Sequence, residues 1–161
     1  MIAEALAKRE IGLNEDVDAM GLALEEARKA ALRGEVPVGA VLVRAGAVLA
    51  ASGNRIVETR DPTAHAEIYV IRAGAAKLGS ERLTDCDLYV SLEPCAMCAG
   101  AISLARIRRL YYGAADEKGG GVDHGARVFA QPTCHHAPEV YGGMREVEAG
   151  DMLRAFFKAR R

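Results

Sequence analysis

Segments with helical periodicity alternate with short runs of apolar, β-branched residues along most of this chain. Within residues 16–33 and again within 65–78, apolar residues recur every three or four positions, and Gly79 ends the second run. Two short runs, Val38–Val43 and Ala47–Ala51, are separated by a tight turn and predict a β-hairpin. Such an alternation is typical of a sheet whose strands are connected through helices.

The second half of the chain continues this alternation. Leu88–Leu92 and Ile107–Tyr112 predict strands, and the apolar segment Pro94–Ala105 between them predicts a helix that begins with a proline. A glycine-rich loop around Gly119–Gly121 follows, and Ala149–Arg161 predicts a final helix. The simplest arrangement of these elements is an α/β fold with helices on both faces of one sheet.

Length and charge limit the classes of protein to which the chain can belong. Its 161 residues include 21 Lys and Arg against 22 Asp and Glu, and 50% are apolar. One domain over residues 15–161 is expected, preceded by a loosely attached extension over residues 1–14. The near-neutral charge argues against a protein that coats nucleic acid or membranes, and no stretch predicts a transmembrane helix. The N-terminus resembles neither a secretory signal nor a transit peptide, so we expect a cytoplasmic protein.

Two motifs, each at the start of a predicted helix, carry most of the chemical information. One is His65-Ala66-Glu67, and the other is Pro94-Cys95-Ala96-Met97-Cys98. Cysteines three residues apart lie on one face of a helix, and a helix N-terminus favours their thiolate forms. Two thiolates and an imidazole suit zinc, so His65, Cys95 and Cys98 are candidate ligands. Three protein ligands leave a fourth tetrahedral position for water, which indicates a catalytic site.

Glu67 is the candidate proton carrier of such a site. A carboxylate beside the metal can take a proton from the bound water and deliver it to a ring nitrogen and a leaving amine. Within a regular helix, however, the side chains of His65 and Glu67 would diverge by about 200°. Both can face the metal only if His65 lies at the entrance of the helix. Together the two motifs form the signature of zinc-dependent nucleobase deaminases.

The two cysteines are also compatible with roles other than a catalytic zinc site. A Cys-x-x-Cys pair can be half of a structural zinc site or a redox pair. In the structural alternative, a fourth ligand from Cys134, His135 or His136 closes the site and leaves Glu67 as a surface carboxylate. Spacing alone does not decide between a closed and an open site.

Three segments of the chain resemble the bacterial tRNA-specific adenosine deaminase family, which belongs to the cytidine deaminase-like superfamily. These segments are Glu35–Val41, Asp61–Glu67 and Leu92–Ile102, and the similarity runs from about residue 16 to residue 161. The resemblance implies a three-layer α-β-α fold of the cytidine deaminase-like type. Its central sheet is expected to be mixed, with helices on both faces.

The resemblance also implies an activity and its partners. Zinc-bound hydroxide would attack C6 of the adenosine at the wobble position of a tRNA anticodon, with Glu67 as the proton shuttle. The products would be inosine and ammonia. One zinc ion per subunit is expected, held by His65, Cys95 and Cys98, and the enzyme is expected to be a homodimer that binds the tRNA anticodon stem-loop.

The same resemblance assigns residues to substrate binding. Asn54 and Ala66 are expected at the flipped base, Asp116 at the ribose and Lys118 near the RNA backbone. An amide such as Asn54 can both donate to and accept from a purine edge. Asn54 can equally do no more than shape its own turn.

The C-terminal segment is the expected RNA-binding element. Residues 150–161 contain four basic residues and one acidic residue, a net charge of +3, whereas the whole chain carries −1. Phe156, Phe157 and Arg160 in this segment match the family. Adjacent helical residues point about 100° apart, so we expect one phenylalanine to pack on the core and the other to face RNA. The sequence alone is equally compatible with both rings lying in the core or in a dimer contact.

Some features depart from the family pattern, and other functions compete. The glycines at 119–121 and the pair His135-His136 are unusual, and no role is assigned to these residues or to His124. The alternative function is a deaminase of a free base or nucleoside, of the guanine or cytosine type, which would need no RNA-binding tail. A non-catalytic, zinc-stabilised RNA-binding protein is a third class, which the presence of Glu67 disfavours.

Overall fold

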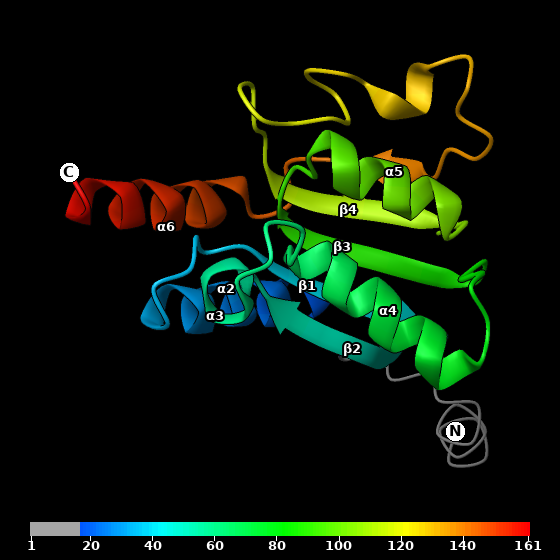
Figure 1. Cartoon of the computed structure of the whole chain (residues 1–161), viewed down its shortest axis with the longest axis horizontal. Coiled ribbons are helices and arrows are strands. Elements are labelled where there is room, and N and C mark those ends of the chain that lie inside the picture. The colour runs from blue at the N-terminus through cyan, green and yellow to red at the C-terminus, as the bar shows by residue number, and fades with distance from the viewer. Residues whose placement is uncertain (1–16) are drawn as a thin grey trace, which may run out of the picture.

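A computed structural model describes residues 17–161, which fold around one five-stranded sheet (Figure 1). The strands are β1 (Gly39–Arg44), β2 (Ala47–Gly53), β3 (Cys86–Leu92), β4 (Arg109–Ala114) and β5 (Glu139–Tyr141). They lie in the order β2-β1-β3-β4-β5. β1 is antiparallel to both β2 and β3, whereas β3, β4 and β5 run parallel. The sheet is therefore mixed, as the resemblance implied.

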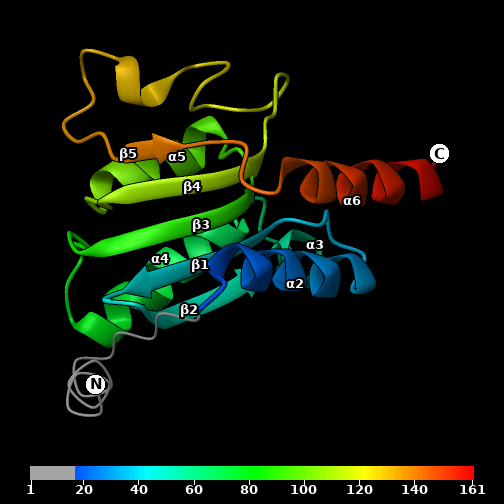
Figure 2. The same ribbon diagram turned by 180° about the vertical axis from the view of Figure 1, so that it is seen from behind.

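Helices cover both faces of this sheet, and the turned view shows the second face (Figure 2). They are α2 (Ala19–Leu32), α3 (Ile56–Thr59), α4 (Ala66–Leu78), α5 (Ala96–Leu104) and α6 (Glu146–Ala159), with one 3-10 turn at Val128–Ala130. Helices α4 and α5 pack on one face, and α2 and the first part of α6 pack on the other. The predicted α/β fold with three layers is confirmed.

Strand β1 shows how the two faces are built. Ala40 and Leu42 belong to the core beneath α4 and α5, whereas Val41 and Val43 belong to the core beneath α2. Successive side chains of a strand point to opposite faces, so a strand buried on both faces needs an unbroken apolar run. Its first residue, Gly39, lies so close to α2 that a Cβ there would come within 1.9 Å of a backbone carbonyl oxygen. Only glycine allows this contact.

The structure adds elements that periodicity did not predict. Helix α3, the turn at 128–130 and strand β5 are each three or four residues long, too short to show a period. Helix α6 begins at Glu146 instead of Ala149. Its first turn buries no side chain, and Val147 there is 69% exposed, so the apolar pattern starts later than the helix does.

Two further expectations concern the N-terminal extension and membrane-spanning helices. The predicted extension over residues 1–14 lies outside the described residues. Among the helices of the described part, none is long and apolar enough to cross a bilayer.

Candidate active site

Two loops that lead into helices bring the three candidate metal ligands together. His65 immediately precedes α4 and Cys95 immediately precedes α5, and both have extended backbone conformations. Cys98 lies in the first turn of α5 and is buried. The Nδ1 atom of His65 is 3.7 Å from Cys95 Sγ and 3.5 Å from Cys98 Sγ. His65 therefore lies at the helix entrance, as the placement of Glu67 required.

The spacing of these donor atoms fits zinc. Zinc bonds of about 2.3 Å to sulfur and about 2.0–2.1 Å to nitrogen, at a tetrahedral angle, place sulfur and nitrogen about 3.6 Å apart. The two observed distances, 3.5 and 3.7 Å, bracket this value. His65, Cys95 and Cys98 are also the only such group of three or more metal-binding side chains found within residues 17–161.

The two thiols and the imidazole shift one another's pKa values. A hydrogen bond from the Cys98 thiol lowers the pKa of Cys95 to about 4, and the same interaction raises the pKa of Cys98. The hydrogen bond to Cys95 raises the pKa of His65. The cluster thus gathers negative charge on sulfur at neutral pH, which favours a bound cation.

Glu67 lies in the first turn of α4, beside the cluster, and its side chain is buried. Burial raises the pKa of this carboxyl. Its Oε1 is the one buried side-chain oxygen or nitrogen of the described residues that has no hydrogen-bond partner. A buried polar atom without a partner is costly, so its presence indicates a place for a ligand group or a water molecule.

A hollow opens beside Glu67 and the metal ligands. It is lined further by Val36, Val38, Asn54, Ile56, Leu92, Glu93 and Asp116. Apolar walls with a few polar groups are typical of a pocket for a flat heterocycle. The structure thus brings Asn54 and Asp116 to the cluster, whereas the four apolar residues were not singled out from the sequence. Val36 and Val38 do lie in a segment that resembles the deaminase family, Glu35–Val41, and this resemblance was the available signal for them.

Asn54 and Ala66 interact directly across this hollow. The Oδ1 atom of Asn54 accepts a hydrogen bond of 2.9 Å from the Ala66 amide, at the first residue of α4. The Ala66 side chain is fully buried. The structure therefore gives Ala66 a role in orienting Asn54, and leaves the amide nitrogen of Asn54 as the group that can donate to a ligand.

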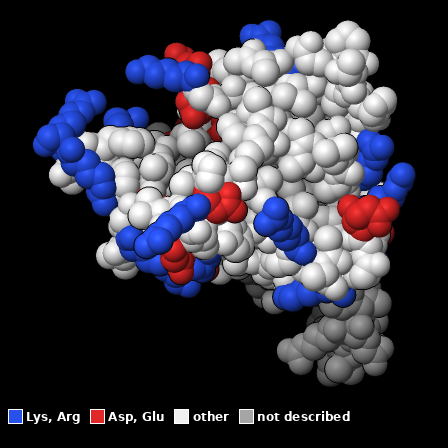
Figure 3. All heavy atoms as spheres, in the orientation of Figure 1, with Lys and Arg blue, Asp and Glu red and all other residues white. Residues whose placement is uncertain are grey.

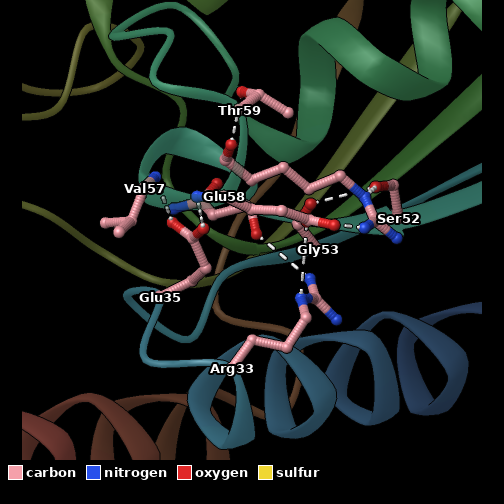
Figure 4. Close-up of polar contacts among 9 residues, drawn as sticks. Arg33, Glu35, Ser52, Gly53, Val57, Glu58 and Thr59 are labelled. Carbon is pink, nitrogen blue, oxygen red and sulfur yellow. Dashed lines mark hydrogen bonds and ion pairs between the residues drawn. The ribbon is translucent and has the colours of Figure 1, made fainter.

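A buried carboxylate holds the wall that carries Asn54 (Figure 4). Glu35 is 1% exposed, and its two oxygens accept hydrogen bonds from the amides of Val57 at 3.0 Å and Glu58 at 2.9 Å. It thereby caps the short helix α3. Arg33 donates from Nη2 to the Asn54 carbonyl oxygen at 3.1 Å. Sequence reasoning assigned no role to either residue, although Glu35 begins one of the segments that resemble the family.

Three of the four remaining residues predicted to bind RNA, Lys118, Phe157 and Arg160, lie at a second hollow, whereas Phe156 does not line it. This hollow lies at the end of α6 and is lined by Lys118, Leu153, Arg154, Phe157, Lys158 and Arg160, with Arg161 beside them. Figure 3 shows basic side chains gathered at this end of the molecule. Lys118 comes from the loop after β4, so two distant segments build this surface.

The two adjacent phenylalanines have different surroundings. Phe156 is 8% exposed, whereas Phe157 is 48% exposed. The Arg160 guanidinium lies 3.4 Å from the centroid of the Phe156 ring and also donates to the Phe156 carbonyl oxygen. Phe156 therefore packs and supports Arg160, and Phe157 is the ring that is open to a partner.

The alternative with a fourth protein ligand is not supported. Cys134 donates to the carbonyl oxygen of His136, and Ser103 donates to the same atom. Ser103 lies at the end of α5, whereas Cys95 precedes its start, and at 1.5 Å per residue these points are about 12 Å apart. Cys134 and His136 thus contact the far end of α5, and within residues 17–161 the candidate metal-binding group consists of His65, Cys95 and Cys98.

Sequence comparisons give the chain relatives along most of its length. The family model of MafB19-like deaminases matches residues 14–161. The tRNA-specific adenosine deaminase of Agrobacterium fabrum is 63% identical over 142 residues, which cover 88% of this chain and 93% of that protein. The tRNA-specific adenosine deaminase of Bacillus subtilis is 43% identical over 136 residues, 84% of either chain.

Solved structures show the same fold. One, from studies of A-to-I editing by tRNA:A34 deaminases at the wobble position of transfer RNA, has a TM-score of 0.83 and 64% identity. The match covers 84% of this chain and 98% of the chain in that structure. Guanine deaminase from Nitrosomonas europaea has a TM-score of 0.70 and 26% identity, over 86% of this chain and 82% of its own.

Proposed function

Because the chain belongs to the tRNA-specific adenosine deaminases, within the MafB19-like deaminase family, we propose that it converts adenosine to inosine at the wobble position of a tRNA anticodon. The observation that carries this proposal is the unpartnered Glu67 Oε1, which lies beside a three-ligand cluster in a pocket with Asn54 and Asp116. Adenosine and water would give inosine and ammonia. Residues 15–161 would form the single deaminase domain.

His65, Cys95 and Cys98 would hold one zinc ion per subunit, because their spacing and charge fit it. Zinc bound there supplies Lewis acidity and a water of lowered pKa at neutral pH. The protein must then move protons between this water and the base. Glu67 lines the same pocket as His65 and Cys95, so its carboxylate is the group that would take a proton from the water and deliver it to the base.

The pocket residues would orient the base. The carbonyl oxygen of the Asn54 side chain is already bound to Ala66, so its amide nitrogen would donate to an acceptor on the purine edge. Val36, Val38, Ile56 and Leu92 would contact the faces of the ring. Asp116 at the mouth would contact the ribose. An anticodon loop presents unstacked bases, so extruding the adenine costs less than it would from a duplex.

The hollow at the end of α6 would grip the RNA outside the pocket. Lys118, Arg160 and the neighbouring basic residues would contact phosphates, and Phe157 would stack on a base. The guanine deaminase relative shows that this fold is also found in enzymes named for a free base. The RNA-binding hollow is what favours the tRNA substrate over that alternative.

Phe157→Ala is expected to raise the KM for an anticodon stem-loop by about tenfold and to leave kcat within a factor of two. Stacking of one base on an aromatic ring accounts for an effect of this order. Steady-state kinetics of inosine formation measure both constants. Val147→Ala removes another exposed apolar side chain, from the other end of α6, and serves as the control. An unchanged KM in Phe157→Ala would remove Phe157 from the RNA-binding surface.

The deciding experiment for the function uses purified protein and a short anticodon stem-loop with adenosine at the wobble position. Inosine formation appears as an adenosine-to-guanosine change on sequencing. Conversion that depends on this adenosine supports the proposal. No conversion by a folded, zinc-loaded enzyme that does release ammonia from guanine or cytosine would establish the free-base alternative instead.

We also propose that the enzyme acts as a homodimer in the cytoplasm, where its tRNA substrate is found. Leu104 and Met97 on α5 are 75% and 38% exposed, and the surface over α5 is largely uncharged (Figure 3). Apolar side chains on such a surface are suited to contact a second copy. Sedimentation of the purified protein measures its oligomeric state directly.

A further inference from the structure

Glu93 is a buried carboxylate that accepts five hydrogen bonds. It follows β3, precedes the Pro94-Cys95 pair and is 2% exposed. Its Oε1 accepts from the Asp116 amide at 3.1 Å and from Nδ1 of His124 at 2.7 Å. Its Oε2 accepts from three successive amides, those of Val122, Asp123 and His124, at 3.0–3.2 Å. One side chain thus binds both ends of the loop formed by residues 116–124.

The glycines of this loop allow it to close on the carboxylate. A Cβ on Gly120 would lie 2.4 Å from Glu93 Oε2, and one on Gly121 would lie 2.5 Å from the backbone nitrogen of Ala96. Neither position can carry a side chain without displacing the loop. The run of glycines, to which the sequence assigned no role, is therefore a requirement of this closure.

The 116–124 loop connects the two hollows of the molecule. Asp116 lines the pocket beside Glu67, and Lys118 lines the hollow at the end of α6. Within the loop, Asp116 Oδ1 accepts from the amides of Lys118 and Gly119, at 3.2 and 2.9 Å. The position of both substrate-facing side chains therefore follows from where the loop is held.

We propose that the buried Glu93 and the partly exposed His124 form an anchor that positions Asp116 and Lys118 for RNA binding. The inference rests on the proposed function and adds two positioning residues to it. Glu93 acts from the interior of the protein through backbone amides, and His124 adds the one side-chain donor. The anchor should therefore affect how tightly the anticodon stem-loop binds, and leave the proton transfers by Glu67 unchanged once it is bound.

Three variants test this proposal. His124→Ala removes one hydrogen bond to a carboxylate and is expected to raise the KM for the stem-loop about tenfold, with kcat within a factor of two. His124→Gln keeps a side-chain N–H donor and is expected to recover most of the lost affinity. Glu93→Gln turns one acceptor oxygen into a donor that faces amide N–H groups, and a larger increase in KM is expected. Glu81→Gln, which neutralises an exposed carboxylate between α4 and β3 that lines neither hollow, is the control and should leave KM unchanged.

Zinc content and melting temperature are measured for every variant, because Glu93 lies close to Cys95. A His124→Ala enzyme with full zinc content and wild-type KM would overturn the proposal, as would a lower kcat at unchanged KM. If the wild-type enzyme does not convert the stem-loop, the proposed function is wrong, but the anchor can still be tested through binding. Anisotropy with the same labelled stem-loop then tests the anchor: weaker binding by His124→Ala than by Glu81→Gln supports it, and equal binding overturns it.

Discussion

Glu67→Gln is expected to lower kcat for inosine formation by about 10²–10⁴-fold while zinc content stays at that of the wild type. The carboxamide has nearly the shape of the carboxyl group but cannot carry a proton, and general acid–base catalysis contributes rate enhancements of this size. Glu67 is buried and its Oε1 has no partner in the described structure, so the substitution breaks no hydrogen bond of that atom. Single-turnover kinetics with the anticodon stem-loop, together with elemental analysis, measure both quantities.

The matched control for this variant is Glu81→Gln, which neutralises an exposed carboxylate away from the pocket. It should retain wild-type kcat and KM. Turnover by Glu67→Gln within tenfold of the wild type, at full zinc occupancy, would mean that another group carries the proton. Loss of zinc from Glu67→Gln would instead mean that this carboxylate is a ligand.

Cys95→Ser is expected to weaken zinc binding by more than about 100-fold. Loss of a residue that only hydrogen-bonds to a metal ligand weakens binding by up to about 100-fold, and loss of a ligand should cost more. It should also lower the melting temperature of the protein. His65 and Cys95 immediately precede α4 and α5, so an ion between them ties the starts of two helices together. Metal binding and folding are coupled in such sites. Competition with a chromophoric chelator and thermal unfolding measure the two effects.

The control for this variant is Cys134→Ser, which changes another free cysteine that lies at the far end of α5. It should bind zinc as tightly as the wild type. Treatment of the wild-type protein with a strong chelator is expected to reproduce the melting temperature of Cys95→Ser. Full zinc occupancy in Cys95→Ser, or no effect of the chelator on unfolding, would contradict the proposed ligand set.

The layers of the fold could be predicted from local patterns, and its finer parts could not. Apolar periodicity revealed α2, α4 and α5 together with the strands between them, because these elements bury side chains at regular intervals. Helix α3 escaped prediction because its cap, Glu35, lies far from it along the chain. The antiparallel pairing of β1 with β3 depends on contacts that no local pattern encodes, and only the resemblance implied a mixed sheet.

The candidate site divides in the same way. His65, Glu67, Cys95 and Cys98 were visible because their chemistry depends on which side chains stand at short, fixed spacings. Glu35 and Glu93 were missed because their partners are mostly backbone amides, which every residue except proline possesses and which therefore leave no mark in a sequence.

The anchoring of the 116–124 loop through backbone amides has a consequence for how related enzymes can diverge. Four of the five hydrogen bonds to Glu93 come from amides, and only that from the His124 ring depends on side-chain identity. Most positions of the loop can therefore exchange side chains while its path is preserved. Selection for a different RNA could act on the loop surface residue by residue, without first rebuilding the scaffold that holds it.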